Sequence, residues 1–170
     1  ALENIDFVMS MALASDVPTR SAYVHGFEAM VLNTTKPIVY TAGSRMDLKD
    51  IVHMAEIVAG GPEALAANPF LILYDEPSSP LQHTTEAVEK LLYLARKRLP
   101  VIYIPAVMMG GTGPVTQAGS LVQANCETLS GLVIHQLKAK GAPFVTGAGI
   151  PPMDMKTSIC SYGGPEEIKN

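Results

Sequence analysis

The chain has 170 residues, of which 48% are hydrophobic and only 16% are charged, whereas roughly 25% is typical of globular domains. This composition excludes a disordered segment and a solvated helical rod, and it favours a sheet covered on both faces or a surface covered by another chain. The formal net charge is −4 and the Lys and Arg residues form no long run, which argues against nucleic acid and against an anionic membrane surface as partners.

Short apolar runs alternate with longer segments of helical spacing along the chain. Each run is apolar at consecutive positions, which is typical of parallel strands that are buried on both faces. The strands predicted in this way cover residues 5–9, 37–41, 70–74, 101–105 and 143–146.

Helices are predicted between these strands, over residues 21–32, 48–59, 86–98 and 114–139. We expect Asp47 and Thr85 to cap the second and third helices, and Pro114 to stand in the first turn of the fourth. The basic residues 96–98 fall in the last turn of the third helix, where the helix dipole favours cations, so they require no partner. The fourth helix is apolar on nearly every side, which predicts that something beyond its own sheet covers it.

The regular alternation of strands and helices predicts an α/β fold built of parallel (βα) repeats. Five strands fit either a small doubly wound domain or part of a TIM (βα)8 barrel, and a barrel needs about 250 residues. We expect sequential strand order, as in part of a barrel. The chain begins without Met and residues 163–167 resemble the opening of another helix, so we expect residues 1–170 to be one segment of a barrel domain, truncated at both ends. Such a segment has open sheet edges and should self-associate or be marginally stable.

The two cysteines, Cys126 and Cys160, form neither a CxxC pair nor a disulfide framework, and no signal peptide begins the chain. A reduced, cytoplasmic protein is therefore the expectation, with Cys126 as a core residue of the fourth helix. The stretch between Leu99 and Leu137 has a single charged residue, Glu127. Prolines and glycines interrupt it too often for a membrane span, so we expect it to form buried core.

In both candidate folds, ligands bind at the carboxyl ends of the strands. Asp75 and Glu76 directly follow the third predicted strand, and two carboxylates there could hold a cation or act as general acid and base. The alternative is that one of them is solvated and the other caps a turn.

The glycine-rich run 108–114 joins the fourth strand to the fourth helix. Glycines allow a ligand to approach the backbone closely, and a helix N-terminus offers free N–H groups. The alternative is a tight turn without a ligand. No dinucleotide fingerprint, P-loop or hydrolase nucleophile motif can be written through the chain, and the histidines lack metal-ligand spacing, so no metal site is expected.

Several motifs in one order carry a resemblance to a known family. They are residues 75–81 (DEPSSPL), 100–103 (PVIY) and 109–119 (MGGTGPVTQAG), followed by Asn125, Glu127 and residues 129–131, and then by residues 153–157 and 162–166. Together they resemble the trimethylamine methyltransferase family, most strongly from residue 68 to the end of the chain.

The resemblance implies a (βα)8 barrel that transfers a methyl group from a tertiary or quaternary methylamine, such as trimethylamine or glycine betaine, to the cobalt of a cognate corrinoid protein. It implies that the enzyme binds no cofactor directly, since the corrinoid is carried by the partner protein, and we expect a homo-oligomer. The trimethylamine enzymes contain pyrrolysine, at a position that falls after Asn170, and relatives without it act on quaternary amines. The implied catalytic residue is Glu76, and the implied substrate-binding residues are Asp75, Tyr103, Gly110, Gly111, Thr112 and Gly113.

A quaternary ammonium group has no N–H, so carboxylates and aromatic faces are the groups that can hold it. Glu76 would supply charge, and Tyr103 or Tyr74 would supply a ring if its side chain points inward. Two alternatives stay open: a barrel-like binding or scaffold protein without catalysis, and a flavodoxin-like domain that binds phosphate or a nucleotide at residues 110–113.

Overall fold

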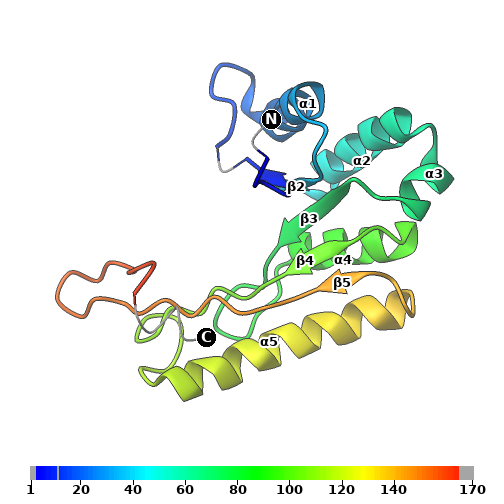
Figure 1. The fold of residues 1–170 in the computed structure, drawn as a ribbon. Helices are drawn as coiled ribbons and strands as arrows, with labels where there is room; N and C mark the ends of the chain where they lie inside the picture. The colour runs from blue at the N-terminus through cyan, green and yellow to red at the C-terminus, as the bar shows by residue number, and fades with distance from the viewer. Residues whose placement is uncertain (1–2, 11, 165–170) are drawn as a thin grey trace.

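The computed structural model describes residues 3–10 and 12–164 of the chain, and all five of its strands belong to one parallel sheet (Figure 1). The spatial order is β1-β2-β3-β4-β5, so every strand pairs with its neighbours in sequence. This order confirms the expected α/β architecture as part of a TIM barrel, because a doubly wound sheet would reverse its order in the middle. The strands are β1 (Val8–Met9), β2 (Ile38–Tyr40), β3 (Leu71–Asp75), β4 (Val101–Tyr103) and β5 (Phe144–Val145).

Right-handed crossovers in sequential order place the helices on one side of the sheet, as Figure 1 shows. The helices are α1 (Ala22–Asn33), α2 (Arg45–Ala59), α3 (Pro62–Ala67), α4 (Thr85–Lys97) and α5 (Gln117–Lys138), and a short 3₁₀ helix, Thr19–Ser21, precedes α1. Four of them match the predicted ranges within three residues at either end. The sequence pattern did not indicate α3, because six residues are too few to show helical spacing.

The helix caps differ from those predicted. Ser44, not Asp47, caps α2: its hydroxyl accepts a hydrogen bond from the Asp47 N–H at 3.2 Å, and the Asp47 carboxylate accepts one from the Ser44 N–H at 2.9 Å. Thr84 caps α4, and Thr116 caps α5. Each of these three residues has the extended backbone that a cap requires. The cap therefore lies before the predicted residue in α2 and α4, and α5 begins after Pro114 rather than at it.

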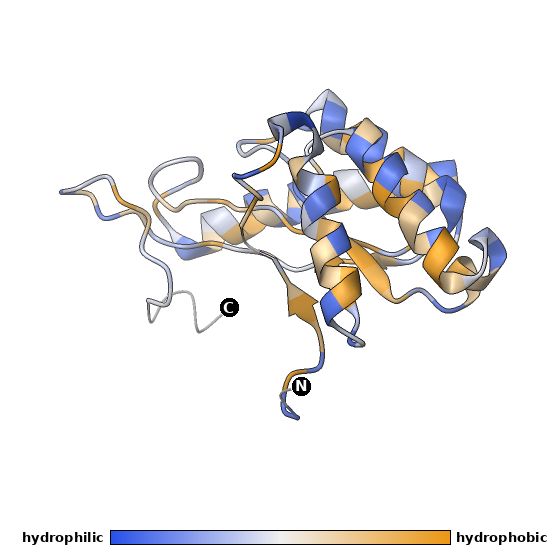
Figure 2. Cartoon of the chain, turned by 90° about the horizontal axis from the view of Figure 1, so that it is seen from above, coloured by the Kyte–Doolittle hydropathy of each residue, from blue (hydrophilic) through white to orange (hydrophobic). Residues whose placement is uncertain are grey.

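Within the described residues, helices cover one face of the sheet, and the other face is covered only in part, most completely at Val39 of β2. Leu71, Leu73 and Asp75 of β3 are buried, whereas Ile72 and Tyr74 between them are half-buried. Side chains alternate between faces along a strand, so the first three face the helices. The sequence predicted strands that are buried on both faces of the sheet. In β3, only the side chains that face the helices are fully buried. Figure 2 shows the strands as hydrophobic, with hydrophobic and hydrophilic residues side by side on the helices. The core consists of side chains from the covered face and from α1, α2 and α4, among them Phe27, Ile38, Tyr40, Ile51, Leu73, Leu91 and Val101.

Helix α5 is buried only along the side that faces the sheet. Ala124, Gly131 and His135 lie on that side and are buried. On the other sides, apolar residues are exposed, among them Leu121, Val122, Leu129, Val133 and Leu137. Nothing within the described residues covers these side chains. The sequence predicted that α5 is buried on nearly every side, and this part of the chain does not supply that burial. Cys126, expected in the core, is exposed as well.

We expect the isolated 170-residue chain to self-associate. Val122, Val133 and Leu137 expose apolar surface on α5, and β1 and β5 are the outer strands of the described sheet; both features favour association. Sedimentation velocity should show species larger than a monomer whose share rises with concentration. Replacing these three residues with lysine should lower that share. A stable monomer across the concentration range would contradict the prediction.

The helix opening that the sequence indicates at residues 163–167 falls largely outside the described residues. Within the part that the structure describes, no helix combines the length and the hydropathy that crossing a lipid bilayer requires.

Candidate functional site

Glu76 follows β3 at its carboxyl end and is exposed. Because side chains alternate, Glu76 continues the row of Ile72 and Tyr74, on the face that no helix covers. The Tyr74 hydroxyl donates a long hydrogen bond of 3.4 Å to Glu76 Oε2. Burial, and then the negative charge of Glu76, raise the pKa of the Tyr74 hydroxyl, and Tyr162 is close enough to contribute in the same direction. An exposed carboxylate and the Tyr74 ring therefore lie together at this end of the sheet.

Asp75 points to the opposite face. Its carboxylate accepts a hydrogen bond from the Lys90 ammonium of α4 at 2.8 Å, and the same ammonium donates to the Ala42 carbonyl at 3.0 Å. Asp75 is only 5% exposed and Lys90 only 7%, and Asp75 Oδ2 has no hydrogen-bond partner. Burial raises the pKa of the Asp75 carboxyl, although Lys90 acts in the opposite direction. The two neighbouring acids thus do not converge on one ligand, and Asp75 instead links β3 to α4 and to the loop after β2.

Tyr103 also faces the helices. It pairs with Asp75 across β3 and β4 and is fully buried. A Cβ atom on Gly131 of α5 would stand 2.5 Å from its ring, so the ring packs directly on the backbone of α5. The ring that accompanies Glu76 on the uncovered face is therefore Tyr74 rather than Tyr103, because even and odd positions of a strand face opposite ways.

The Tyr103 hydroxyl belongs to a short polar chain. It lies 2.7 Å from His83 Nδ1, and His83 Nε2 lies 2.7 Å from Ser130 Oγ. Burial raises the pKa of Tyr103. Burial also lowers the pKa of His83, against the opposing effect of the Glu127 charge. Both groups are thus held neutral around pH 7, as a hydrogen-bonded structural link between the β3–α4 loop and α5.

The backbone of the glycine loop, residues 108–113, is hydrogen-bonded within itself. The Met108 carbonyl accepts from the N–H groups of Gly111, Thr112 and Gly113, each at 3.0 Å, and the Gly110 N–H donates to the Gly113 carbonyl at 3.1 Å. These four N–H groups are therefore already used. A phosphate-binding loop needs N–H groups that point at the ligand, so the flavodoxin-like alternative finds no support at residues 110–113.

The glycines of this loop differ in what they require. Gly110 has a φ of +80°, which side chains rarely allow. A Cβ on Gly111 would stand 2.3 Å from the flexible end of Met108, and one on Gly113 would stand 2.3 Å from Val107. Gly110 also lines a hollow of about 270 Å³ between the loop and the segment after β5. The hollow is rich in methionine and is otherwise lined by Met109, Val115, Gln117, Pro152, Met153 and Met155.

Glu127 of α5 has hydrogen-bond partners at this end of the sheet that sequence reasoning missed. It is 1% exposed. Its carboxylate accepts from Ser79 Oγ at 2.7 Å, from the Leu81 N–H at 2.8 Å and from Gln123 Nε2 at 2.9 Å. The one charge in a long uncharged stretch is a signal that it has buried partners, but no local pattern identifies Ser79 and Leu81.

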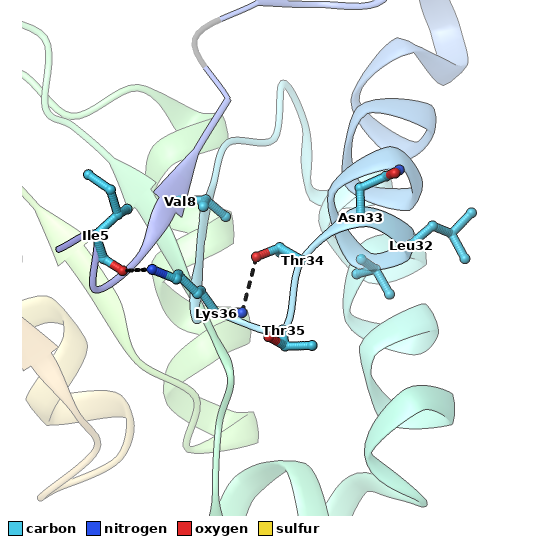
Figure 3. A pocket seen from close by; sticks show the side chains of 8 residues that line it. Ile5, Val8, Leu32, Asn33, Thr34, Thr35 and Lys36 are labelled. Atoms are coloured by element: carbon cyan, nitrogen blue, oxygen red, sulfur yellow. Dashed lines mark hydrogen bonds between the residues drawn. The ribbon is translucent and has the colours of Figure 1, made fainter. Parts of the chain in front are cut away.

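A larger hollow, of about 720 Å³, lies elsewhere (Figure 3). Its lining comes from the end of α1, the following loop and the segment before β1, and the Lys36 ammonium contacts the Ile5 carbonyl there. Apart from Val8, which is the first residue of β1, these residues precede β1 and β2 and so lie at the amino ends of the strands. Ligands of parallel α/β sheets bind at the carboxyl ends, so we do not take this hollow as the candidate site.

No metal-binding cluster of three or more His, Cys, Asp or Glu side chains is found within residues 3–10 and 12–164. At the carboxyl end of β3, the Glu76 carboxylate and the Tyr74 ring are groups that could bind a small cation.

Comparison with known proteins gives one consistent result. The sequence profile of a family described as trimethylamine methyltransferase (MTTB) matches residues 3–170. The chain is 35% identical to the trimethylamine methyltransferase MttB of Desulfitobacterium hafniense over 98% of its own length and 34% of that protein. It is 31% identical to the enzyme of the same name from Methanosarcina thermophila, over 96% of its own length and 34% of that protein.

A third relative is named for another amine. The glycine betaine methyltransferase of Desulfitobacterium hafniense strain Y51 is 28% identical over 92% of this chain and 33% of that protein. The chain therefore spans about a third of the length of the curated relatives it matches.

Proposed function

Because the chain belongs to the trimethylamine methyltransferase family, we propose that the protein containing it transfers a methyl group from a tertiary or quaternary methylamine to the cobalt of a cognate corrinoid protein. The names of the relatives, which include enzymes for trimethylamine and for glycine betaine, support the class of reaction. The corrinoid enters as the methyl acceptor, carried by its own protein, and this chain binds no cofactor of its own.

The observation that carries the proposal is the position of Glu76. It is an exposed carboxylate at the carboxyl end of a barrel strand, on the uncovered face, beside the Tyr74 hydroxyl. A methylammonium group fits such a place, because the carboxylate offers charge and each tyrosine face offers a cation–π contact of about 0.5–2 kcal/mol. We assign Glu76 as the residue that contacts the amine, with Tyr74 as its aromatic neighbour.

The charge balance of the reaction gives Glu76 a second effect. The methyl carbon leaves the nitrogen and bonds to cobalt(I), and the electron pair of the broken C–N bond stays on the nitrogen. A quaternary donor thereby becomes an uncharged tertiary amine. Its attraction to the Glu76 carboxylate falls as the reaction proceeds, so the same residue that binds the substrate favours release of the product.

The test uses the full-length protein with its reduced corrinoid partner and follows the absorption change from cobalt(I) to methylcobalt(III). We expect turnover with trimethylamine or glycine betaine. We also expect the uncharged isostere of the active donor, with carbon in place of nitrogen, to bind at least tenfold more weakly, about 1.4 kcal/mol. Absence of turnover with every methylamine, or equal binding of the isostere, would contradict the proposal.

A further inference from the structure

Two loops at the carboxyl end of the sheet are tied to the same place on α5. The β3–α4 loop, residues 76–84, carries Glu76 and contacts the Glu127 carboxylate through Ser79 Oγ and the Leu81 N–H. The glycine loop contacts Gln123, whose amide Nε2 donates to the Thr112 carbonyl at 3.0 Å and to Glu127 Oε1 at 2.9 Å. Gln123 and Glu127 lie one helical turn apart, so a continuous hydrogen-bonded path joins the two loops.

The β3–α4 loop needs this support because part of it has an unfavourable backbone conformation. Ser78 and Gln82 close a narrow turn through two hydrogen bonds, of 2.9 and 3.0 Å. Leu81, between them, has a φ of +56°. A left-handed conformation costs a residue with a side chain roughly 1–2 kcal/mol and persists only where its surroundings enforce it. The Glu127 carboxylate, which accepts from the Leu81 N–H, supplies part of that enforcement.

The chemistry of the path explains why its centre is a glutamate. An ionised carboxylate accepts hydrogen bonds and donates none. Glu127 can therefore accept from a hydroxyl, a backbone N–H and an amide at once, and no basic side chain within the described residues forms an ion pair with it. Glutamine at the same place would remove the negative charge, so the bonds from the Leu81 N–H and from the Gln123 amide would become neutral hydrogen bonds, which are roughly half as strong. Its N–H group would also face Ser79 Oγ, so the Ser79 hydroxyl could no longer donate to residue 127.

We propose that Glu127 and Gln123 are positioning residues that hold two loops in a fixed relation: the β3–α4 loop, which carries the amine-binding Glu76, and the glycine loop at the same end of the sheet, against which we place the incoming methyl acceptor. This inference rests on the proposed function. Neither residue contacts the amine, and each acts on the reaction through the loop that it holds.

The chain offers a matched control for Gln123. Gln136 lies on the same helix near its C-terminal end, where its amide donates to the Ala142 carbonyl at 2.9 Å and accepts from the Gly141 N–H at 2.8 Å. It thus also fixes a loop backbone, but at the amino end of the neighbouring strand β5. Gln123→Leu and Gln136→Leu each remove a side-chain amide that bonds to loop carbonyls, and only the first lies on the path between the two loops.

In full-length protein, we expect Gln123→Leu to lower the kcat of methyl transfer at least tenfold, about 1.4 kcal/mol, while the dissociation constant of the amine changes less than about threefold. Glu127→Gln should weaken amine binding as well, because it releases the loop that carries Glu76. Gln136→Leu should lower the midpoint of unfolding to a similar degree as Gln123→Leu. It should leave the kcat of methyl transfer and the dissociation constant of the amine at their wild-type values.

Hydrogen exchange provides a readout that does not depend on activity. Glu127→Gln should speed exchange in residues 76–84 and 108–113, and Gln123→Leu should do so in residues 108–113. If Gln123→Leu and Gln136→Leu reduce turnover equally, or if exchange in residues 108–113 is unchanged in both Gln123→Leu and Glu127→Gln, the positioning role is wrong. Wild-type protein that methylates no corrinoid partner would instead overturn the proposed function, and the exchange data would still decide whether the loops are coupled.

Discussion

Replacing Glu76 with glutamine in the full-length protein should lower kcat/KM for amine-dependent corrinoid methylation at least tenfold, which corresponds to about 1.4 kcal/mol. The amide keeps the size and the hydrogen-bonding capacity of the side chain but removes the charge that attracts the methylammonium group. Because Glu76 is exposed, the substitution should leave the free energy of unfolding nearly unchanged.

The loss should fall mainly on KM. In the proposed reaction, the positive charge of a quaternary donor is full in the bound substrate and declines as the C–N bond breaks, so the proposed contact with Glu76 should stabilise the ground state at least as much as the transition state. An interaction of this kind raises KM when it is removed and changes kcat little. Steady-state kinetics over a range of amine concentrations separates the two parameters.

Two further variants sharpen this result. Glu89→Gln removes an exposed carboxylate from α4 and should leave kinetics unchanged. Asp75→Asn alters an acid that adjoins Glu76 in sequence but faces Lys90, so it should affect stability and leave the amine KM near the wild-type value. If Glu76→Gln retains normal KM and Asp75→Asn does not, the amine site lies at Asp75 instead.

Replacing Lys90 with methionine should destabilise the fold by about 3–5 kcal/mol, because it leaves the Asp75 carboxylate buried without its cation. The pair is almost fully buried, and Lys90 also holds the Ala42 carbonyl. Urea unfolding of the full-length protein, followed by a signal from this barrel, gives the change in unfolding free energy. The double variant Asp75→Asn, Lys90→Met should recover much of the loss, since it removes the unpaired charge together with its partner.

The pH dependence of the Lys90 variant has a definite sign. The folded-state pKa of Asp75 is already raised by burial, and losing Lys90 raises it further, so the folded state binds this proton more tightly than the unfolded state. The resulting stabilisation is complete below the unfolded-state pKa and is lost as pH rises through the folded-state pKa. The variant should therefore approach wild-type stability on acidification. A deficit that stays constant as the pH falls would show that Asp75 is not its source.

Four of the helices could be predicted from sequence because helical spacing is a local pattern, and the strand order could be predicted from the regular alternation of strands and helices. The sequence could not predict which side chains of each strand point toward the helices. A run that is apolar at consecutive positions has no alternation, so nothing in residues 70–76 indicates whether Asp75 or Glu76 faces the helices. The same ambiguity made Tyr103 a candidate ring, whereas the structure places it against Gly131.

The network around Glu127 escaped prediction for a different reason. Its partners Ser79 and Leu81 lie 48 and 46 residues away along the chain, and their bonds form only once α5 packs beside the β3–α4 loop. The sequence predicted that the stretch around this lone acid forms buried core, but it gave no prediction for the acid itself. Identifying those partners requires the packing itself.

The strand order also affects how this part of the protein can fold during synthesis. Each strand pairs with the strand made immediately before it, so no strand waits for a distant segment to emerge from the ribosome before it can find a neighbour. Contacts between nearby segments form quickly because little chain entropy is lost in closing the intervening loop. The sheet can therefore grow one βα unit at a time in the direction of translation, each new strand adding to the edge that the previous one leaves open.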